Sequence, residues 1–441
     1  MRSNRAEKQH AAEPARHPSS ASPTAGHTYL ASTAETPARR HDDVRAPTDV
    51  HDVSIIDDDV PGAVGRLLGH LLAQRTAQAT LLDPVFAHDL AARVARFTLN
   101  GGKRIRSQFA WWALRAGGGE ARDTEAALRI GAALELIQTC ALVHDDVMDG
   151  SRLRRGRLAL HADVEAQYAD ATPPPHGTRF GEASAILAGD LALAWADDVL
   201  ADTEFTADTG RRVRGLWSSM RMEMVAGQYM DIHGQTTSSR SSARAIRAAC
   251  LKSALYSVER PLALGAALAG ADTATTASLC AAGRCVGIAF QLRDDLHDVF
   301  GAPQRTGKHS GSDIRLGKPT YLVAVAQARA EAEDDHRALA VLRHSLGCTD
   351  LSESGLSTVR DVLVSTGARD RVETKIDRLA AQAIRHLDTA GLHPDGLRRL
   401  RDLMHSVVTS ATPPHPSGSP GSEVGMPVSH LLTAVAERAP R

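Results

Sequence analysis

The sequence predicts an all-α fold, a single large bundle of long helices around a central cavity. Apolar residues recur at intervals of three and four, which is the period of an amphipathic helix. Ala, Leu and Arg, which favour helices, dominate these stretches, and alternating β-branched runs are absent. Three long stretches show the pattern: "EAALRIGAALELIQTCALVHDDVMD", "GEASAILAGDLALAWADDVLA" and "AAGRCVGIAFQLRDDLHDVFG". A bundle of this kind places its site in the interior, between facing helices.

Bulk composition limits the classes of function. The chain has 441 residues, of which 43% are hydrophobic, enough for a sizeable core. Lys plus Arg number 51 and Asp plus Glu 52, so the net charge does not point to nucleic acid or an anionic membrane. The five cysteines lack metal-ligand spacing. No uninterrupted apolar run approaches the roughly 20 residues that span a bilayer, and no secretory signal is evident. We expect a cytoplasmic protein without a membrane span.

Composition also divides the chain into three parts. Residues 1–50 are poor in large apolar side chains, which predicts a disordered leader. Residues 51–410 form the predicted helical domain, and the three prolines of "ADATPPPHGTRFG" predict a loop within it. Residues 411–441 are expected to form a flexible tail, because "SATPPHPSGSPGSEVGMP" precedes only a short apolar segment.

Two acidic motifs of the form Asp-Asp-x-x-Asp end apolar helical segments. On a helix, the first and last aspartates of each motif lie four residues apart and share a face. Clustered carboxylates repel one another unless cations neutralise them, and oxygen-only ligands suit Mg²⁺. The sequence therefore predicts magnesium ligands at Asp145, Asp146 and Asp149 in "ALVHDDVMDGSRLRRGR" and at Asp294, Asp295 and Asp298 in "FQLRDDLHDVFG".

Basic residues follow two of the helical segments. Lys103, Arg104 and Arg106 come after two glycines in "NGGKRIRSQ", where a bound anion would offset the unfavourable charge at a helix start. Arg154 and Arg155 follow the first acidic motif, and arginine binds phosphate oxygens in a bidentate fashion. A diphosphate could thus lie between carboxylate-bound Mg²⁺ and these guanidinium groups. Alone, an acidic triplet or a basic turn is usually solvated surface; it is the combination that favours a site.

Taken together, the motifs resemble those of the polyprenyl synthetase family, the trans-type isoprenyl diphosphate synthases. The resemblance covers about residues 60 to 400. It rests on "GGKRIR", "LIQTCALVHDDVMDGSRLRRG", "AILAGD", "MVAGQYMD", "LKSALYS", "FQLRDDLHD" and "TGKHSGSDIRLGKPT", in this order. It implies a homodimeric enzyme that ionises an allylic diphosphate and joins the cation to isopentenyl diphosphate, with three Mg²⁺ ions per active site. The ions, lysines and arginines would stabilise the negative charge of the departing diphosphate.

The resemblance also implies roles for single residues. Asp145, Asp149 and Asp294 match direct metal ligands, and Asp146, Asp295 and Asp298 match ligands that act directly or through water. The isopentenyl diphosphate site would comprise Lys103, Arg106, Gln138 and Arg155. The allylic side would comprise Arg154, the catalytic Lys252, Ser253, Gln291, Lys308 and Lys318. Gln138 stands where many relatives have His, and Ser253 replaces the more usual Thr. Gly227, Gln228 and Asp231 match a further, supporting motif.

The residues beneath the first motif bear on product length. Ala141 lies one helical turn below Asp145, Cys140 lies beside it, and Ile137 lies two turns below. In the family that the sequence resembles, a bulky aromatic residue at the position of Cys140 or Ala141 closes the bottom of the cavity and stops the growing prenyl chain at fifteen carbons. Both residues are small here, so we expect geranylgeranyl diphosphate, with Ile137 contributing to the floor. Close helix packing would equally explain small residues, which leaves farnesyl or longer products open.

Other classes fit the sequence less well. His144 beside Asp145 suits an HD-type phosphohydrolase, but that reading leaves "DDLHD" unexplained. A class I terpene cyclase shares the first motif but normally has a second motif with Asn or Asp, Ser or Thr, and Glu. A noncatalytic regulatory subunit of a prenyl diphosphate synthase is disfavoured by the intact aspartate and basic motifs.

Overall fold

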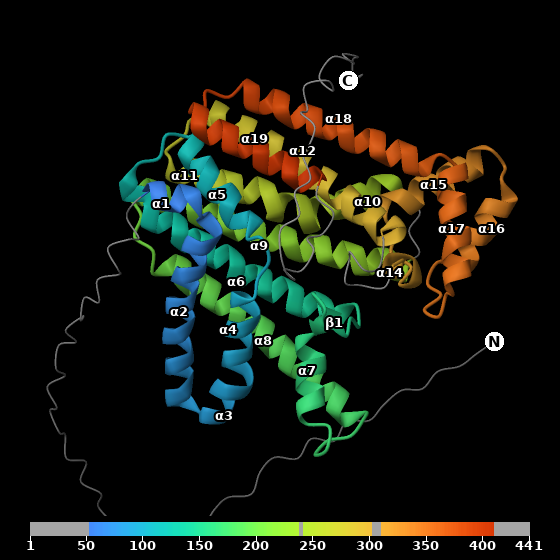
Figure 1. The fold of residues 1–441 in the computed structure, drawn as a ribbon, viewed down its shortest axis with the longest axis horizontal. Helices are drawn as coiled ribbons and strands as arrows, with labels where there is room; N and C mark the ends of the chain where they lie inside the picture. The colour runs from blue at the N-terminus through green and yellow to red at the C-terminus, as the bar shows by residue number, and fades with distance from the viewer. Residues whose placement is uncertain (1–52, 238–240, 302–309, 410–441) are drawn as a thin grey trace, which may run out of the picture. The chain divides into compact units, whose positions relative to one another are not determined.

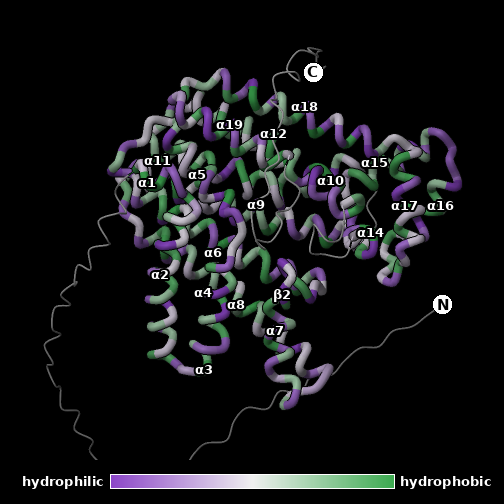
Figure 2. The backbone as a smooth tube through the Cα atoms, in the orientation of Figure 1, coloured by the Kyte–Doolittle hydropathy of each residue, from purple (hydrophilic) through white to green (hydrophobic). Residues whose placement is uncertain are grey.

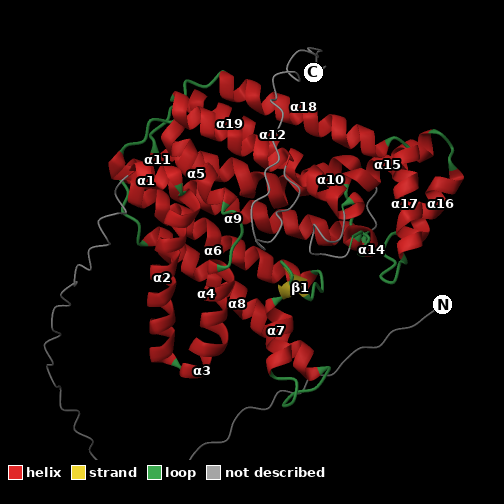
Figure 3. Cartoon of the chain, in the orientation of Figure 1, coloured by secondary structure: helices red, strands yellow, loops and turns green. Residues whose placement is uncertain are grey.

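The computed structural model describes residues 53–237, 241–301 and 310–409, and most of these residues are helical (Figures 1 and 3). Helices of the first half are α1 (Val53–Asp58), α2 (Val60–Leu82), α3 (Pro84–Phe86), η2 (Ala87–Ala91), α4 (Ala92–Leu99), α5 (Ile105–Ala116), η3 (Ala121–Asp123), α6 (Thr124–Met148), α7 (Leu160–Gln167), α8 (His176–Ala201) and α9 (Ala207–Thr236). Those of the second half are α10 (Ser242–Ala249), η4 (Cys250–Glu259), α11 (Arg260–Leu268), α12 (Thr273–Phe300), α14 (Ser312–Arg315), α15 (Tyr321–Ala332), α16 (His336–Ser345), α17 (Glu353–Ser365), α18 (Ala368–Asp388) and α19 (Pro394–Thr409).

Within the described residues, strand structure is limited to a small hairpin. Strands β1 (Leu153–Arg154) and β2 (Arg157–Leu158) pair antiparallel, with Arg154 opposite Arg157. The predicted all-α class is therefore confirmed. The predicted leader and tail lie outside the described residues. The prolines of "ADATPPPHGTRFG" lie between α7 and α8, as the sequence predicts.

Helix α6 lies in the core and packs along α8. Their close approach depends on Gly189, because a Cβ there would lie 2.1 Å from Nε2 of His144. The His144 ring instead contacts the backbone of α8, with Nε2 3.0 Å from the carbonyl oxygen of Ile186. This contact near the end of α6 fixes the position of the first acidic motif.

The helical stretch Ala121–Met148, which includes α6, is also long and apolar enough to cross a bilayer. However, 72% of its most apolar window is buried inside the protein. The sequence prediction did not identify this segment as a possible membrane span, because Arg129 and Glu135 interrupt its apolar residues. Its place in the core accounts for its apolar character.

The outer helices show the expected two-sided pattern. Hydrophilic and apolar residues alternate along α18 (Figure 2), and its buried side chains, which include Val372, Ile376 and Leu387, recur at about one per turn. Helix α18 packs on α12, which thereby has α18 on one side and η4 on another.

Helix η4 is a π-helix of ten residues that continues α10 without a break. Glycines bring it close to two neighbours. A Cβ at Gly227 of α9 would lie 2.2 Å from the backbone nitrogen of Lys252, and one at Gly287 of α12 would lie 2.5 Å from Cα of Ala254. π-Helical turns often occur at functional sites. Here the π-helix is held between α9 and α12, and its side chains Lys252 and Tyr256 reach Asp145 and Gln138 of α6.

Candidate active site

The first acidic motif ends α6, with Asp149 as the C-cap residue. Carboxylates at a helix C-terminus are unfavourable because they face the negative end of the helix dipole. Two lysines from distant elements offset this. The Nζ atom of Lys252 lies 3.1 Å from Oδ1 of Asp145, and Nζ of Lys318 lies 2.6 Å from Oδ2 of Asp149. The predicted metal ligands and two predicted diphosphate ligands are thus brought together.

Helix α9 completes this cluster. Lys252 also contacts Asp231, with Nζ 2.7 Å from Oδ2, and Nε2 of Gln228 donates a 3.1 Å hydrogen bond to Asp145. In the sequence these two α9 residues match only a supporting motif, because a polar residue within a helix is usually on its solvated face. In the structure both line the end of the acidic cluster.

Electrostatics keep these groups charged. Burial would raise the pKa of Asp145, but Lys252, Lys318 and Arg154 outweigh it and hold the pKa at about 2. Burial would likewise lower the pKa values of Lys252 and Lys318, but the surrounding carboxylates raise both. At neutral pH Asp145 is therefore ionised, and Lys252 and Lys318 are protonated. Ionised carboxylates are the form that binds a hard cation.

Asp146 has different surroundings and is fully buried. Nε of Arg154 donates a 2.9 Å hydrogen bond to Oδ1 of Asp146, and Nη2 donates to the same oxygen. Nη2 also lies 3.5 Å from Asp145. Asp146 thus anchors Arg154 and the β1–β2 hairpin against α6. Its predicted part as a metal ligand stays a prediction.

The second acidic motif lies on α12, where Asp295 is buried. Nε2 of Gln291 donates to it at 2.8 Å, and Oγ of Ser253 donates to Gln291 at 2.6 Å. Burial, with the nearby Asp313 carboxylate, raises the pKa of Asp295 well above its usual range. The predicted allylic-side residues Ser253 and Gln291 are therefore joined to the second motif in one chain of hydrogen bonds. Asp294 precedes Asp295 and is half-buried.

Asp298, the last aspartate of this motif, holds the chain that leads into α14. Its carboxylate accepts hydrogen bonds from Oγ of Ser312 and, at 2.9 Å, from the backbone N–H of Asp313. Its backbone carbonyl accepts from the N–H of Gly311 at 2.6 Å. These contacts tie α14 to the end of α12. They give Asp298 a structural task, and its part as a metal ligand stays a prediction.

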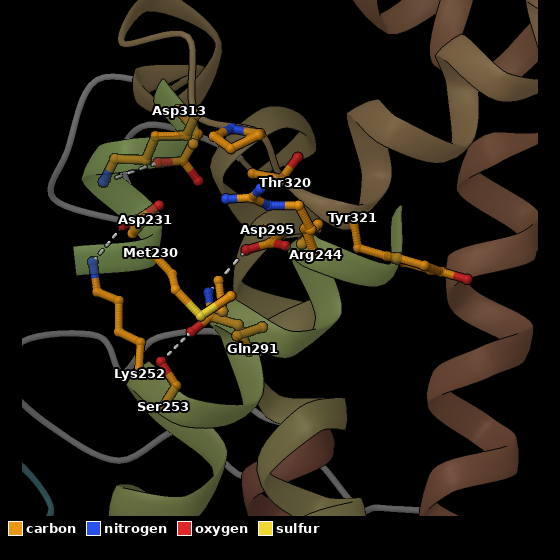
Figure 4. A pocket seen from close by; sticks show the side chains of 16 residues that line it. Met230, Asp231, Arg244, Lys252, Ser253, Gln291, Asp295, Asp313, Thr320 and Tyr321 are labelled. Carbon is orange, nitrogen blue, oxygen red and sulfur yellow. Dashed lines mark hydrogen bonds and ion pairs between the residues drawn. The ribbon is translucent and has the colours of Figure 1, made fainter. Parts of the chain in front are cut away.

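A pocket lies between Asp295 of the second acidic motif and the two lysines, Lys252 and Lys318, that contact the first motif (Figure 4). It is lined by side chains of α9, α10, η4 and α12 and by the segment that leads into α15. The lining residues are Met230, Asp231, Gly234, Arg244, Ala245, Ala248, Ala249, Lys252, Ser253, Gln291, Asp295, Asp313, Lys318, Pro319, Thr320 and Tyr321. Sequence reasoning missed Asp313, whose Oδ1 lies 3.7 Å from Nζ of Lys318, although it stands within "TGKHSGSDIRLGKPT".

The far end of η4 contacts the basic side of the predicted site. Arg106 donates from Nη2 to Oγ of Ser257 at 2.7 Å, and its guanidinium lies 4.2 Å from the ring centroid of Tyr256. The hydroxyl of Tyr256 donates to Oε1 of Gln138. Tyr256, which sequence reasoning missed, therefore joins two residues of the predicted isopentenyl diphosphate site.

The turns that carry the other arginines have unusual backbones. Arg104 and Arg155 both have left-handed conformations, with φ of 49° and 54°. Nη1 of Arg155 donates to the carbonyl oxygen of Asn100 at 3.0 Å. Lys103 is exposed in the turn before α5. These contacts bring the Gly-Gly turn and the β1–β2 hairpin together beside α5.

A buried carboxylate lies beneath these arginines. Oε1 of Glu135 accepts a 3.1 Å hydrogen bond from Ser107. Burial raises the pKa of Glu135, although Arg106, Arg104 and Arg155 oppose the shift. Nε of Arg106 and Nη1 of Arg104 are buried without a hydrogen-bond partner among the described residues. Unpaired buried donors are costly, so these atoms indicate a missing acceptor.

The donor set suits a hard metal ion. In the described parts of the chain, no three His, Cys, Asp or Glu side chains converge closely enough to hold one. The reason is that ammonium groups of Lys252 and Lys318 lie between the carboxylates. All candidate ligands are oxygen atoms, as Mg²⁺ prefers, so displacement of the lysines would leave a fitting set. Lys308 lies outside the described residues.

Comparison with known proteins agrees with this geometry. The family profile described as Polyprenyl synthetase matches residues 88–356. The chain is 31% identical to the (2E,6E)-farnesyl diphosphate synthase of Mycobacterium tuberculosis, over 70% of this chain and 80% of that protein. It is 30% identical to a geranylfarnesyl diphosphate synthase of Aeropyrum pernix, over 62% and 79%.

A solved structure is also similar. It is geranylgeranyl pyrophosphate synthase of Corynebacterium glutamicum, complexed with isoprenyl diphosphate and magnesium, with a TM-score of 0.73 and 36% identity. The match covers 78% of this chain and 98% of that one. The chain therefore belongs to the polyprenyl synthetase family of chain-elongating prenyltransferases.

Proposed function

We propose that the chain condenses isopentenyl diphosphate with allylic diphosphates and releases geranylgeranyl diphosphate as its main product. One observation carries the proposal: η4 presents Lys252 and Ser253 to the two acidic motifs and Tyr256 and Ser257 to the basic cluster. Two anionic substrates could thus bind on either side of one helix, with their reacting carbons between them. Holding two reactants in this way lowers the barrier of their condensation.

On the allylic side, the resident cofactor would be Mg²⁺, with three ions per site. The family resemblance and the oxygen donors support Asp145, Asp149 and Asp294 as direct ligands. Asp146, Asp295 and Asp298 would act directly or through water. When bound, the ions supply positive charge that neutralises the diphosphate and stabilises it as a leaving group.

The protein's own cations share that task. Once their carboxylate partners bind metal, Lys252 and Lys318 would turn to the diphosphate oxygens, together with Arg154 and Lys308. The Ser253–Gln291 hydrogen bond, at 2.6 Å, orients these two side chains at the pocket wall. Negative charge on the diphosphate grows as the carbon–oxygen bond breaks, so these donors stabilise the transition state more than the ground state.

On the isopentenyl side, Lys103, Arg106, Gln138 and Arg155 would hold the second diphosphate. The unpaired Nε of Arg106 supports this assignment, because a phosphate oxygen would supply its missing acceptor. The acceptor's double bond would then attack the allylic cation, and the proton lost afterwards would pass to the released diphosphate.

Product length depends on the space beneath Asp145. The Sγ atom of Cys140 lies 3.7 Å from Nδ1 of His144, Ala141 is half-buried, and Ile137 is fully buried. No bulky side chain stands at position 140 or 141, which supports growth beyond fifteen carbons. Relatives make farnesyl and geranylfarnesyl products, so both are alternatives for this chain.

The chain is also proposed to form a cytoplasmic homodimer. Helices α8 and α9 expose large apolar side chains, among them Leu187, Met222, Val225 and Tyr229. A two-fold contact between these faces in two copies would cover them. Light scattering of the purified chain should give twice the monomer mass, and Leu187→Asp with Val225→Asp should shift the mass toward the monomer. A monomeric wild-type chain would contradict the proposal.

The test of the function uses the purified full chain with Mg²⁺, radiolabelled isopentenyl diphosphate and allylic primers of increasing length. Chromatography of the dephosphorylated products should show geranylgeraniol as the main species. A dominant fifteen-carbon product would favour the farnesyl alternative, and no elongation would favour a noncatalytic subunit.

A second variant locates the cavity. Ala141→Phe should shorten the product without abolishing turnover, because an aromatic ring would block the space one turn below Asp145. Unchanged product length would show that Ala141 does not line the path of the chain.

A further inference from the structure

The pocket beside Lys252 contains a cation that the family motifs leave unassigned. Three described cations line the pocket: Arg244, Lys252 and Lys318. The two lysines are neutralised, since each has two carboxylates within 4.0 Å. Among the described residues, Arg244 has no carboxylate partner. Its guanidinium contacts the imidazole ring of His233, with Nη2 3.1 Å from Nδ1.

Arg244 is also not explained as a stabilising helix residue. It lies in the first turn of α10, where the helix dipole disfavours a positive charge. The residue four positions later is Ala248, so the helix offers no ion pair at that spacing. By contrast, Arg247 stands in the last turn of α10 and does not line the pocket. No carboxylate among the described residues lies within 4.0 Å of Arg244, so a ligand in the pocket is a candidate for its counter-charge.

The pocket wall leaves room for such a ligand. On α10 the lining residues next to Arg244 are Ala245, Ala248 and Ala249, which are short. Figure 4 shows the guanidinium of Arg244 pointing into the pocket, toward Asp313 and Asp231. Lys252 and Lys318 reach the pocket from the side of those carboxylates. An anion bound by the lysines would therefore face Arg244 across the pocket.

We propose that Arg244 is a further binding residue for the diphosphate of the allylic substrate and for the pyrophosphate that it releases. The inference rests on the proposed function, because it places the allylic diphosphate on the Lys252 side of η4. A guanidinium binds phosphate oxygens with paired hydrogen bonds that an ammonium group cannot form. The proposed isopentenyl site lies at the other end of η4, around Arg106 and Tyr256, and neither of these residues lines the pocket of Arg244.

The experiment compares Arg244→Gln, Arg244→Lys and the control Arg247→Gln with the wild-type full chain. Calorimetry with inorganic pyrophosphate and Mg²⁺ measures binding without turnover, and steady-state kinetics gives KM for each substrate. For Arg244→Gln we expect about tenfold weaker pyrophosphate binding and a similar rise in KM for the allylic substrate, from the loss of a charged hydrogen bond. KM for isopentenyl diphosphate should not change. Arg244→Lys should recover only part of the affinity, and Arg247→Gln should match the wild type.

Unchanged pyrophosphate affinity in Arg244→Gln would overturn the inference, as would an equal rise in KM for both substrates. Circular dichroism spectra of the variants check that a loss does not come from unfolding; an affinity loss that follows lost helicity counts against the inference. If the wild-type chain elongates no primer, the proposed function fails. If it does, and Arg244→Gln binds pyrophosphate normally, only the role of Arg244 fails.

Discussion

At the Lys252 end of η4 the cations lie against carboxylates, whereas at the Ser257 end the arginines include buried donors that lack a partner in the described part of the chain. Lys252 and Lys318 each contact two aspartates. Arg106 contacts Ser257 and Tyr256, and its Nε lacks an acceptor among the described residues. If the proposed function is correct, the first end would have to exchange lysine for metal before it binds a diphosphate. The second end would accept one directly.

The largest effect is expected at the carboxylate end. Asp145→Asn keeps the shape of the side chain but removes the charge that binds metal and Lys252. We expect kcat to fall about 1,000-fold, in the range seen when a transition-state contact is lost. The matched control is Asp208→Asn, since this aspartate is exposed on α9. Steady-state kinetics with saturating Mg²⁺ measures the difference, and a variant with wild-type kcat would remove Asp145 from the site.

A smaller effect, confined to one substrate, is expected at the basic end. Arg106→Gln removes the guanidinium that stacks on Tyr256 and would bind phosphate. KM for isopentenyl diphosphate should rise roughly 10- to 100-fold, the value of a charged hydrogen bond. KM for the allylic substrate should stay near the wild-type value. Arg211→Gln on the exposed face of α9 serves as the control. A rise in the allylic KM alone would reverse the assignment of the two ends.

Tyr256→Phe tests how the basic end is positioned. Phenylalanine keeps the ring beneath Arg106 but loses the hydrogen bond to Gln138. KM for isopentenyl diphosphate should rise about threefold to tenfold, as expected for one neutral hydrogen bond. Removing the ring with Tyr256→Leu should cost more. Equal values for the two variants would show that the hydroxyl, and not the stacking, sets the position of Arg106.

Glu135→Gln should give the smallest change, seen in stability. Burial raises the pKa of Glu135, so the folded protein binds this proton more tightly than the unfolded chain, and ionisation destabilises the fold as pH rises above 4.5. Glutamine avoids that cost. The melting temperature should rise by about 1–2 °C at pH 8, for roughly 1 kcal/mol in a domain of this size, and stay unchanged below pH 4.5. A lower melting temperature at pH 8 would contradict this expectation. It would mean that the negative charge of Glu135 stabilises the fold through Arg104, Arg106 and Arg155.

The fold and the acidic motifs could be predicted because both leave a local pattern. In the long helices, apolar residues recur every three to four positions. Asp145 and Asp294 stand in short motifs near helix ends. Contacts across the bundle leave no such pattern. The π-helix η4 packs closely against Gly227 and Gly287, and this packing leaves no local sequence pattern. Sequence reasoning therefore missed that Tyr256 joins Arg106 to Gln138.

Other residues were missed for the same reason. Glu135 and Arg244 resemble ordinary core-facing and surface positions until their neighbours are known. Asp298 shows the opposite case, since its motif suggests metal binding while its carboxylate accepts hydrogen bonds from Ser312 and Asp313.

The most direct test of the difference between the two ends is calorimetric binding of each substrate with and without Mg²⁺. The titrants are isopentenyl diphosphate and an unreactive allylic thiodiphosphate, each in EDTA and in excess Mg²⁺. Isopentenyl diphosphate should bind in both conditions with similar affinity, because no carboxylate in the described parts of the chain lies within hydrogen-bond distance of Arg106 or Arg155. The allylic analogue should bind only with Mg²⁺, because carboxylates hold Lys252 and Lys318. Tight metal-free binding of the allylic analogue, or a strict Mg²⁺ requirement for isopentenyl diphosphate, would contradict the account.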